Sequence, residues 1–236
     1  MGKIKLVTLD LDNTLWDVDS IIIEAEKNLV QWLGDRVPDS LVHYQAETLA
    51  DIRAKVTAAH SDQSHDLSFL RTQILVEVMK RTGLSDSEAN LRARQAFDVF
   101  FEGRNRVVLF PGAEDMLQHL SDKYLLYALT NGNANIDKAG IGHFFSGAYS
   151  SADVGTKKPH PDMFNAPLTA LGFAPTEAIH IGDHLIDDIE GAANVGMYSI
   201  WVNLTRATSS EHLTQPTLEV DHLERVRHAI DAISSN

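Results

Sequence analysis

Cysteine is missing from this sequence of 236 residues. Disulfide bonds, catalytic thiols and zinc sites built on cysteine are therefore excluded. The 11 histidines show no HExxH spacing, so the sequence gives no sign of a zinc site built on histidine either. We expect four of them to be surface or packing residues: His60, His65, His143 and His180.

Long apolar runs and positive charge are also scarce. No run approaches the roughly 18 apolar residues that a membrane-spanning helix needs, and no signal peptide is visible, so we expect no membrane partner and a cytoplasmic location. The 20 lysines and arginines are outnumbered by 33 acidic residues, which gives a net charge of −13. This charge argues against a nucleic-acid partner. An anionic substrate would need local lysines, backbone N–H groups or a bound cation.

Short β-rich runs alternate with helical stretches over much of the chain. The predicted strands are residues 4–10, 124–130, 147–153, 178–183 and 198–203, and the later helices are predicted at 113–121, 134–140, 161–172 and 187–195. Strands that alternate with helices are typical of an α/β fold. We therefore predict a doubly wound, Rossmann-like parallel sheet, followed by a polar loop at 203–216 and a final helix at about 220–233.

Residues 17–105 follow a different pattern. Apolar residues recur there at helical spacing in four stretches, and Gly34, Pro38 and Gly83 mark helix ends or turns. This predicts four helices inserted between the first strand and the rest of the sheet. We therefore divide the chain into an α/β core, residues 1–16 and 106–236, and an all-helical cap, residues 17–105.

Two carboxylates, Asp10 and Asp12, follow the first apolar run. Side chains alternate along a strand, so the two would share a face, where like charges repel. One interpretation is a turn at the strand end, since Asp and Asn are common in turns. The other is a nucleophilic carboxylate beside a second one that acts as acid and base, with Mg²⁺ relieving the repulsion.

Polar residues also follow the other predicted strands, at the sheet edge where ligands bind in such folds. Residues 130–132, Thr-Asn-Gly, are typical of a turn, but the hydroxyl and backbone N–H groups would also hold phosphate oxygens. Lys158 would be either a solvated residue or an inward-pointing charge that neutralises acids and phosphate. Asp183 would join Asp10 in holding Mg²⁺.

Taken in order, these residues resemble the four motifs of the haloacid dehalogenase superfamily. The matching segments are Asp-Leu-Asp-Asn-Thr at 10–14, Thr-Asn-Gly at 130–132, Lys-Pro at 158–159, and Gly-Asp at 182–183 with a further Asp at 188. The resemblance covers the core, and the inserted helices resemble the four-helix cap of that superfamily. Within it, the chain looks most like phosphatases that act on flavin mononucleotide or in the riboflavin pathway.

The resemblance implies a Mg²⁺-dependent phosphatase that acts on a small phosphorylated metabolite, such as flavin mononucleotide or a nucleotide, through an aspartyl-phosphate. Asp10 would be the nucleophile, and Asp12 the acid and then the base. Mg²⁺ would be held by the carboxylates of Asp10 and Asp183 and by the backbone carbonyl of Asp12.

The remaining motif residues would serve the transferring phosphoryl group. Those that would bind it are Thr130, Asn131, Gly132 and the catalytic Lys158. Thr14 would steady the nucleophile loop, and Asp188 would orient Lys158 or a metal-bound water.

Two alternative functions stay open. A 2-haloacid dehalogenase releases halide, which needs no protonation, so the presence of Asp12 disfavours this chemistry. A catalytically inactive binding or regulatory member of the same fold would be expected to lose one of Asp10, Asp12, Lys158 and Asp183, and all four are present.

The substrate and the oligomeric state, monomer or homodimer, also stay open. Trp16, beside the first motif, would either stack on an aromatic ring of the substrate or pack at the hinge between core and cap. Arg71, Arg104 and Arg106 would either meet a second anionic group or be solvated. His184 stands where many relatives carry Ser, and we expect it to face solvent.

Overall fold

The computed structural model describes residues 3–207 and 214–235, so residues 208–213 of the predicted polar loop lie outside the described residues. The chain divides into two compact units. The core unit comprises Met1–Asp17 and Val108–Asn236, and the helical unit comprises Val18–Val107. Among the helices of the described ranges, none combines the length and the apolar character needed to cross a membrane.

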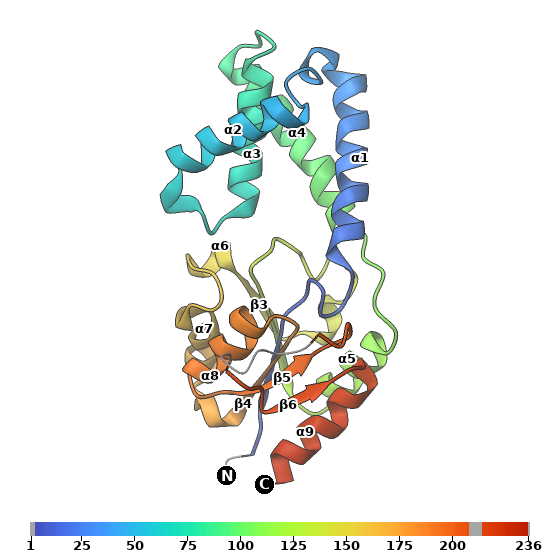
Figure 1. Cartoon of the computed structure of the whole chain (residues 1–236), viewed down its shortest axis with the longest axis vertical. Coiled ribbons are helices and arrows are strands. Elements are labelled where there is room, and N and C mark those ends of the chain that lie inside the picture. The colour runs from blue at the N-terminus through green and yellow to red at the C-terminus, as the bar shows by residue number, and fades with distance from the viewer. Residues whose placement is uncertain (1–2, 208–213, 236) are drawn as a thin grey trace. The chain divides into compact units, whose positions relative to one another are not determined.

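A six-stranded sheet with all neighbours parallel forms the centre of the core unit, in the order β3-β2-β1-β4-β5-β6 (Figure 1). The strands are β1 (Leu6–Leu9), β2 (Leu125–Thr130), β3 (Gly147–Ser150), β4 (Ala178–Gly182), β5 (Tyr198–Val202) and β6 (Leu218–Val220). The strand order reverses at β1, since β2 and β3 lie on one side and β4 to β6 on the other. Such a reversal opens a crevice at the carboxyl ends of the strands. The predicted doubly wound α/β fold is confirmed.

Helices cover both faces of this sheet (Figure 1). One face carries α7 (Pro161–Leu171) and α8 (Gly191–Asn194), and the other carries α5 (Ala113–Ser121) and α9 (Val226–Ser235). The apolar cluster between the sheet and α7 contains Leu6, Leu129, Met163, Phe164, Leu168, Ala178, Ala192 and Met197. The cluster includes Leu6 of β1 and Ala178 of β4 but not the residues that follow them, whose side chains point to the opposite face.

Three elements of the core unit differ from the sequence prediction. Strand β3 ends at Ser150, because the Ser150 side chain and the Asp153 carboxylate form a capping box that starts α6 (Ser151–Val154). Residues 134–140 form turns rather than a helix, and Gly140, with φ of 80°, ends them in a left-handed conformation. The final helix begins at Val226, after β6, which the sequence did not predict.

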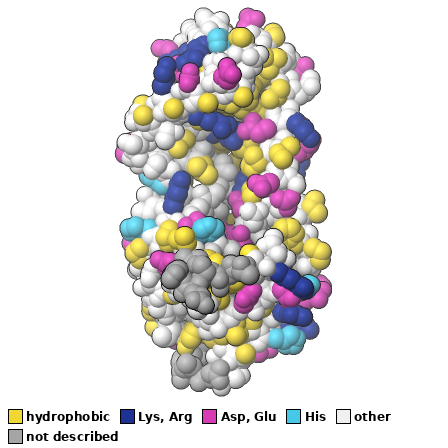
Figure 2. Space-filling view, viewed as in Figure 1, with side chains coloured by type: hydrophobic (Ala, Val, Ile, Leu, Met, Phe, Trp, Pro, Cys, Tyr) yellow, Lys and Arg dark blue, Asp and Glu magenta, His cyan; other side chains and the backbone are white. Residues whose placement is uncertain are grey.

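The helical unit contains α1 (Val18–Arg36), α2 (Ala46–Ala59), α3 (Leu67–Lys80) and α4 (Asp86–Arg104). Side-chain caps start two of them: the Asp66 carboxylate accepts from the N–H of Phe69, and the Ser85 hydroxyl accepts from the N–H of Glu88. Helices α1 and α4 approach closely at Gly103, where an added Cβ would lie 3.0 Å from the Cα of Ala25. Acidic and basic side chains are interspersed over the face shown in Figure 2, and its described residues form no continuous basic patch.

Candidate active site

The carboxyl ends of β1, β2 and β4 meet at one cavity of the core unit, with a volume of about 180 Å³. Asp10 directly follows β1, Thr130 ends β2, and Asp183 directly follows β4. The residues that line the cavity are Asp10, Asp12, Asn13, Thr130, Asn131, Gly132, Lys158, Asp183, His184, Asp187 and Asp188. The structure therefore brings together the acidic residues, the lysine and the Thr-Asn-Gly turn that the sequence singled out.

Asp10 is held from both sides of its carboxylate. The Nζ of Lys158 donates to Oδ1 at 2.6 Å, and the hydroxyl of Thr14 lies 3.1 Å from Oδ2. The same hydroxyl lies 3.1 Å from Oδ1 of Asp183, so Thr14 ties the loop after β1 to the loop after β4. Because Thr14 is fully buried, it steadies the loop rather than contacting a ligand in the cavity.

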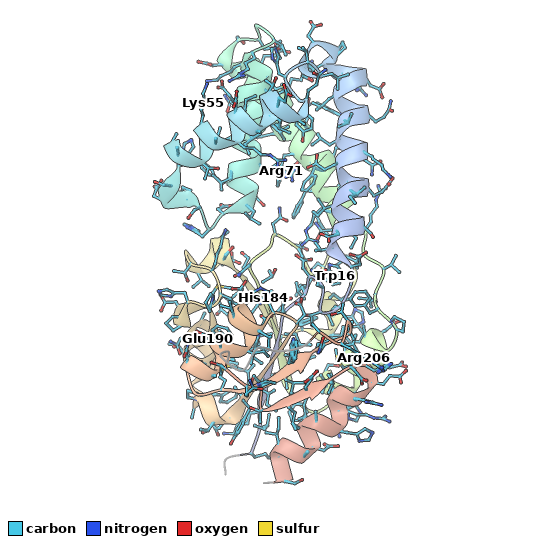
Figure 3. The ribbon with its side chains drawn as sticks, viewed as in Figure 1. Trp16, Lys55, Arg71, His184, Glu190 and Arg206 are labelled. Carbon is cyan, nitrogen blue, oxygen red and sulfur yellow. The ribbon has the colours of Figure 1, made fainter. Side chains whose placement is uncertain are left out.

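Asp12 is presented by a tight turn just after β1. Asn13 adopts a left-handed φ of 61°, which Asn tolerates better than most residues, and its N–H donates to the carbonyl of Trp16 at 2.8 Å. The indole N–H of Trp16 in turn donates to Oδ1 of Asp12 at 2.8 Å. Trp16, labelled in Figure 3, is fully buried and offers no face for stacking. Of the two alternatives for Trp16, burial therefore favours packing over stacking on a substrate ring, and the indole N–H also orients Asp12.

Lys158 points inward and is not a solvated residue. Only 2% of its side chain is exposed, and its Nζ donates to Asp10 and to Oδ1 of Asp188, each at 2.6 Å. Asp188 reaches this place from a π-helical turn, Leu185–Glu190, that follows β4. Its Oδ2 accepts from the backbone N–H of His184 at 3.0 Å. Gly182 makes room for it, because a Cβ at that position would lie 2.3 Å from the Asp188 carboxyl carbon.

Three acidic residues of the cavity, Asp10, Asp183 and Asp188, have shifted pKa values. Burial raises the pKa of Asp10 to about 8. Lys158 lowers this pKa, and the neighbouring Asp188 and Asp183 raise it by less than Lys158 lowers it. Burial, with Asp188, also raises the pKa of Asp183 to about 6. Burial on its own would raise the pKa of Asp188 too. Lys158 and His180 outweigh this effect and hold the pKa of Asp188 well below its usual range. Burial opposes the charge of Lys158, while Asp10 and Asp188 hold its pKa above the usual range.

Three of these carboxylates could hold a metal ion. One oxygen from each of Asp10, Asp183 and Asp188 lies within 4.8 Å of the others. Three carboxylates against the single ammonium group of Lys158 leave negative charge uncompensated in a buried place, which is costly. Oxygen donors of this kind suit a hard divalent cation such as Mg²⁺. The donor set therefore fits a cation, and Asp10 and Asp183 have fewer hydrogen bonds from the protein than Asp188.

Asn131 has a structural task in addition to lining the cavity. Its Oδ1 accepts from the N–H of Lys158 at 2.6 Å, and its Nδ2 donates to the carbonyl of Lys158 at 2.9 Å. The side chain thus clamps the backbone that carries the lysine. The hydroxyl oxygen of Thr130 accepts from the N–H of Gly132 at 2.9 Å, which closes the turn. The hydroxyl proton is not used in this hydrogen bond and can be donated to another acceptor.

One histidine lies within β4 and another follows this strand, in different surroundings. The side chain of His184 is 57% exposed, and its Nδ1 accepts from the N–H of Asp187 at 3.0 Å, so the expectation that it faces solvent is confirmed (Figure 3). His180 is fully buried, and its Nε2 lies 3.0 Å from Oδ1 of Asp188. Sequence reasoning missed this contact. The available signal was a histidine flanked by isoleucines in a buried strand, two residues before the Gly-Asp pair.

The arginines of the helical unit are not uniformly solvated. Arg71 projects from α3 and forms an ion pair with Glu26, and its guanidinium lies 3.6 Å from the centroid of the Phe100 ring (Figure 3). Arg104 is 1% exposed, whereas Arg106 is exposed. Of the two alternatives left open for these arginines, full solvation therefore does not hold for Arg71 and Arg104.

Comparisons with known proteins place these features in one family. The haloacid dehalogenase-like hydrolase family model matches residues 4–196. The 5-amino-6-(5-phospho-D-ribitylamino)uracil phosphatase YigB of Escherichia coli (strain K12) is 32% identical over 86% of this chain and 84% of its own. A glyceraldehyde 3-phosphate phosphatase of Methanothermobacter thermautotrophicus is 32% identical over 94% of this chain and 96% of its own.

A solved structure is similar over nearly the whole chain. It is named a 2-haloacid dehalogenase from Pseudomonas syringae pv. Tomato DC3000, and it matches with a TM-score of 0.92 at 34% identity, covering 97% of this chain and 99% of that one. The resemblance drawn from the motifs is confirmed by the family match and by the two phosphatases. This protein belongs to the haloacid dehalogenase-like hydrolases.

Proposed function

We propose that this protein is a Mg²⁺-dependent phosphatase that hydrolyses a small phosphorylated metabolite through an aspartyl-phosphate on Asp10. The observation that carries the proposal is the buried Lys158 between Asp10 and Asp188, beside a cavity that Asp12 also lines. A small cavity lined by polar groups, with an inward lysine, suits a phosphoryl group, whose transfer depends on positioning and on charge neutralisation. The phosphatases among the relatives support the same reaction class.

In the first step, a carboxylate oxygen of Asp10 attacks the phosphorus of the ester. The bond between phosphorus and the ester oxygen breaks, and Asp12 gives its proton to that oxygen, so that a neutral alcohol leaves. Lys158 faces Asp10 and offsets negative charge during this transfer. The indole of Trp16 holds the Asp12 carboxyl in a defined orientation through its 2.8 Å hydrogen bond.

In the second step, water attacks the phosphorus of the aspartyl-phosphate. Asp12, now a carboxylate, takes a proton from this water, and the bond between phosphorus and the Asp10 oxygen breaks. Inorganic phosphate leaves, and both carboxyl groups return to their starting states. Asp10, Asp183 and the backbone carbonyl of Asp12 would hold the cation, which would supply positive charge to offset the acidic groups and the phosphoryl oxygens. Thr130, Asn131 and Gly132 would contact those oxygens.

The helical unit would act as the cap that selects the substrate. A cavity of about 180 Å³ in the core unit is below the roughly 300 Å³ at which pockets for whole small molecules begin. The core cavity therefore suits the phosphoryl group and the cation, and contacts to the rest of the substrate must come from elsewhere. The name of the Escherichia coli relative contains a phosphorylated ribityl group, so phosphorylated ribityl compounds, among them flavin mononucleotide, are the first esters to test.

A 2-haloacid dehalogenase is the second candidate, because the solved structure with the TM-score of 0.92 has that name. Halide is a leaving group that needs no proton, so dehalogenation has no use for a carboxyl group in the position of Asp12. Here Asp12 lines the cavity and is oriented by a dedicated hydrogen bond from Trp16. This arrangement favours phosphoryl transfer.

The test measures phosphate and halide release in parallel. The panel would contain p-nitrophenyl phosphate, flavin mononucleotide, nucleoside monophosphates, sugar phosphates and 2-chloropropionate, each with Mg²⁺ and with EDTA. We expect Mg²⁺-dependent phosphate release that falls by at least about 1,000-fold in Asp10→Asn. Asp115→Asn, on an exposed part of α5, is the matched control and should leave the rate unchanged. Chloride release without phosphate release, or phosphate release that survives Asp10→Asn, would refute the proposal.

A further inference from the structure

Two polar residues stand in the middle of the two central strands. On β1, Leu6, Thr8 and Asp10 share a face, and on β4, Ala178 and His180 share the same face of the sheet. Leu6 and Ala178 belong to the apolar cluster under α7, whereas Thr8 and His180 are both fully buried and polar. A buried polar group is costly unless it is hydrogen-bonded, so this pair calls for a physical reason.

Thr8 and His180 satisfy each other. The parallel register places them opposite one another, and the Thr8 hydroxyl lies 2.7 Å from Nδ1 of His180. The ring of Phe164 meets the imidazole edge to face, with centroids 5.1 Å apart. Phe164 can lie there because position 191 is glycine, where an added Cβ would come within 2.5 Å of its ring. The imidazole is therefore fixed on one face by packing and at one nitrogen by a hydroxyl.

The other nitrogen faces the active site. Nε2 of His180 lies 3.0 Å from Oδ1 of Asp188, the same oxygen that accepts from Lys158 Nζ at 2.6 Å. An ionised carboxylate only accepts hydrogen bonds, so Nε2 must carry the proton. Nδ1 of the neutral ring is then an acceptor, and Thr8 must be its donor. The partners thus specify one tautomer.

The contacts form a continuous chain from the centre of the sheet to Asp10, in which Asp188 accepts from both sides. Thr8 donates to His180, His180 donates to Asp188, and Lys158 donates to both Asp188 and Asp10. Asp188 lies in a π-helical turn of 6 residues, a short element with little rigidity of its own. The strand, by contrast, is held on both sides by β1 and β5. A link from β4 to Asp188 therefore transfers the rigidity of the sheet to the carboxylate that orients the lysine.

We propose that His180, with its tautomer set by Thr8, is a positioning residue that fixes Asp188 and thereby aims Lys158 at Asp10. This inference rests on the proposed function of Asp10 and Lys158. His180 touches neither substrate nor the reacting atoms, so its effect is on the rate of the chemical step and not on substrate binding. Partners of this kind commonly change activity by about 10- to 100-fold when they are lost.

The test uses two amides that replace the same ring. In His180→Gln, the amide nitrogen reaches the place of Nε2 and can still donate to Asp188. In His180→Asn, the amide of the shorter side chain lies near the position that Nδ1 of the histidine occupied, facing Thr8. Asp188 is then left without the donor that Nε2 supplied. Both variants lose the ring and its contact with Phe164, so the loss of packing is shared.

We expect kcat of His180→Asn to fall by about 10- to 100-fold with KM unchanged, and His180→Gln to recover most of that loss. Thermal unfolding of both variants, measured alongside, corrects for the share of folded protein. Equal kcat in the two variants would overturn the proposal, because a merely structural histidine would be replaced equally well or equally badly by either amide.

A measurement on the wild-type chain needs no substrate. In protein labelled with ¹⁵N at histidine, NMR near neutral pH should show one buried imidazole with its proton on Nε2, and this signal should vanish in His180→Gln. A proton on Nδ1 would overturn the proposal. If the wild type released no phosphate from any ester, the proposed function would fail, and the tautomer would still decide whether Thr8 and His180 present a donor to Asp188.

Discussion

Gly182→Ala is the sharpest perturbation of the site, because a single added methyl group would meet one carboxylate. The new Cβ would lie 2.3 Å from Cγ, 2.4 Å from Oδ2 and 2.6 Å from Cβ of Asp188. Ordinary contact begins at 3.4 Å, so the carboxylate has to retreat by roughly 1 Å. A retreat of that size would stretch the 2.6 Å bond from Lys158 and the 3.0 Å bonds from His180 and the N–H of His184 beyond hydrogen-bond distance.

The cost follows from the contacts that are lost. Breaking a buried ion pair costs about 3–5 kcal/mol of the free energy of unfolding, against a total of about 5–15 kcal/mol for a domain. For a unit of this size we therefore expect the midpoint of thermal unfolding to fall by about 10 °C. Phosphatase activity should fall by at least about 10-fold in protein that is still folded, because Lys158 loses its second carboxylate.

Gly34→Ala is the matched control for this experiment. Gly34 lies within α1, where the added Cβ would have an ordinary contact, 3.6 Å from Cδ1 of Leu41. Alanine favours a helix over glycine by about 1 kcal/mol, so the control should be as stable as the wild type or slightly more stable. Calorimetry and the phosphate-release assay measure both variants. If Gly182→Ala unfolded at the wild-type temperature and kept the wild-type rate, the assigned role of Asp188 would be wrong.

Three further predictions concern the same cavity. Trp16→Phe keeps an aromatic ring but removes the N–H that donates to Asp12 and part of a fully buried side chain, so kcat of the folded protein should fall by about 10-fold and some stability should be lost, and a wild-type kcat would contradict the orienting role. Asn131→Ala removes both hydrogen bonds to the backbone of Lys158 and should lower the free energy of unfolding by about 1–3 kcal/mol in urea titrations, whereas an unchanged midpoint would contradict the clamp. Mg²⁺ should raise the unfolding temperature more at about pH 8 than at about pH 5, since protons compete with the cation for Asp10 and Asp183, whose pKa values are raised to about 8 and about 6. Equal stabilisation at both pH values would contradict these ligands.

Residues at the strand ends could be predicted to meet because topology alone decides it. Asp10, Thr130 and Asp183 each end or follow a strand of a parallel sheet, and all carboxyl ends of such a sheet lie at one edge. The inward direction of Lys158 was one of two alternatives, and only its neighbours in space select between them. The alternation of polar and apolar residues shows where the strands end, and therefore which residues meet. It does not show whether a loop residue such as Lys158 points inward or into solvent.

Contacts between a side chain and a distant backbone left no pattern in the sequence. Asn131 clamps a backbone segment 27 positions further along the chain, and nothing in the turn Thr-Asn-Gly indicates that partner. For Trp16, stacking on a substrate ring and packing at the hinge stayed open, because the sequence does not show that its N–H donates to Asp12. Strand β6 was missed because it is an edge strand of only 3 residues, with Glu219 at its centre.

The long stretch of chain between β1 and β4 has a consequence for synthesis on the ribosome. All four residues of β1 are buried in the finished sheet, yet one of its two neighbouring strands, β4, begins only at Ala178. At roughly 5–20 residues per second, β4 follows β1 by roughly 10–35 s. Residues 18–107, which form a compact unit among themselves, take up about half of that interval. The nascent chain therefore completes its helical unit while the strand that precedes the proposed nucleophile is still an unpaired apolar segment, open to chaperones and to aggregation.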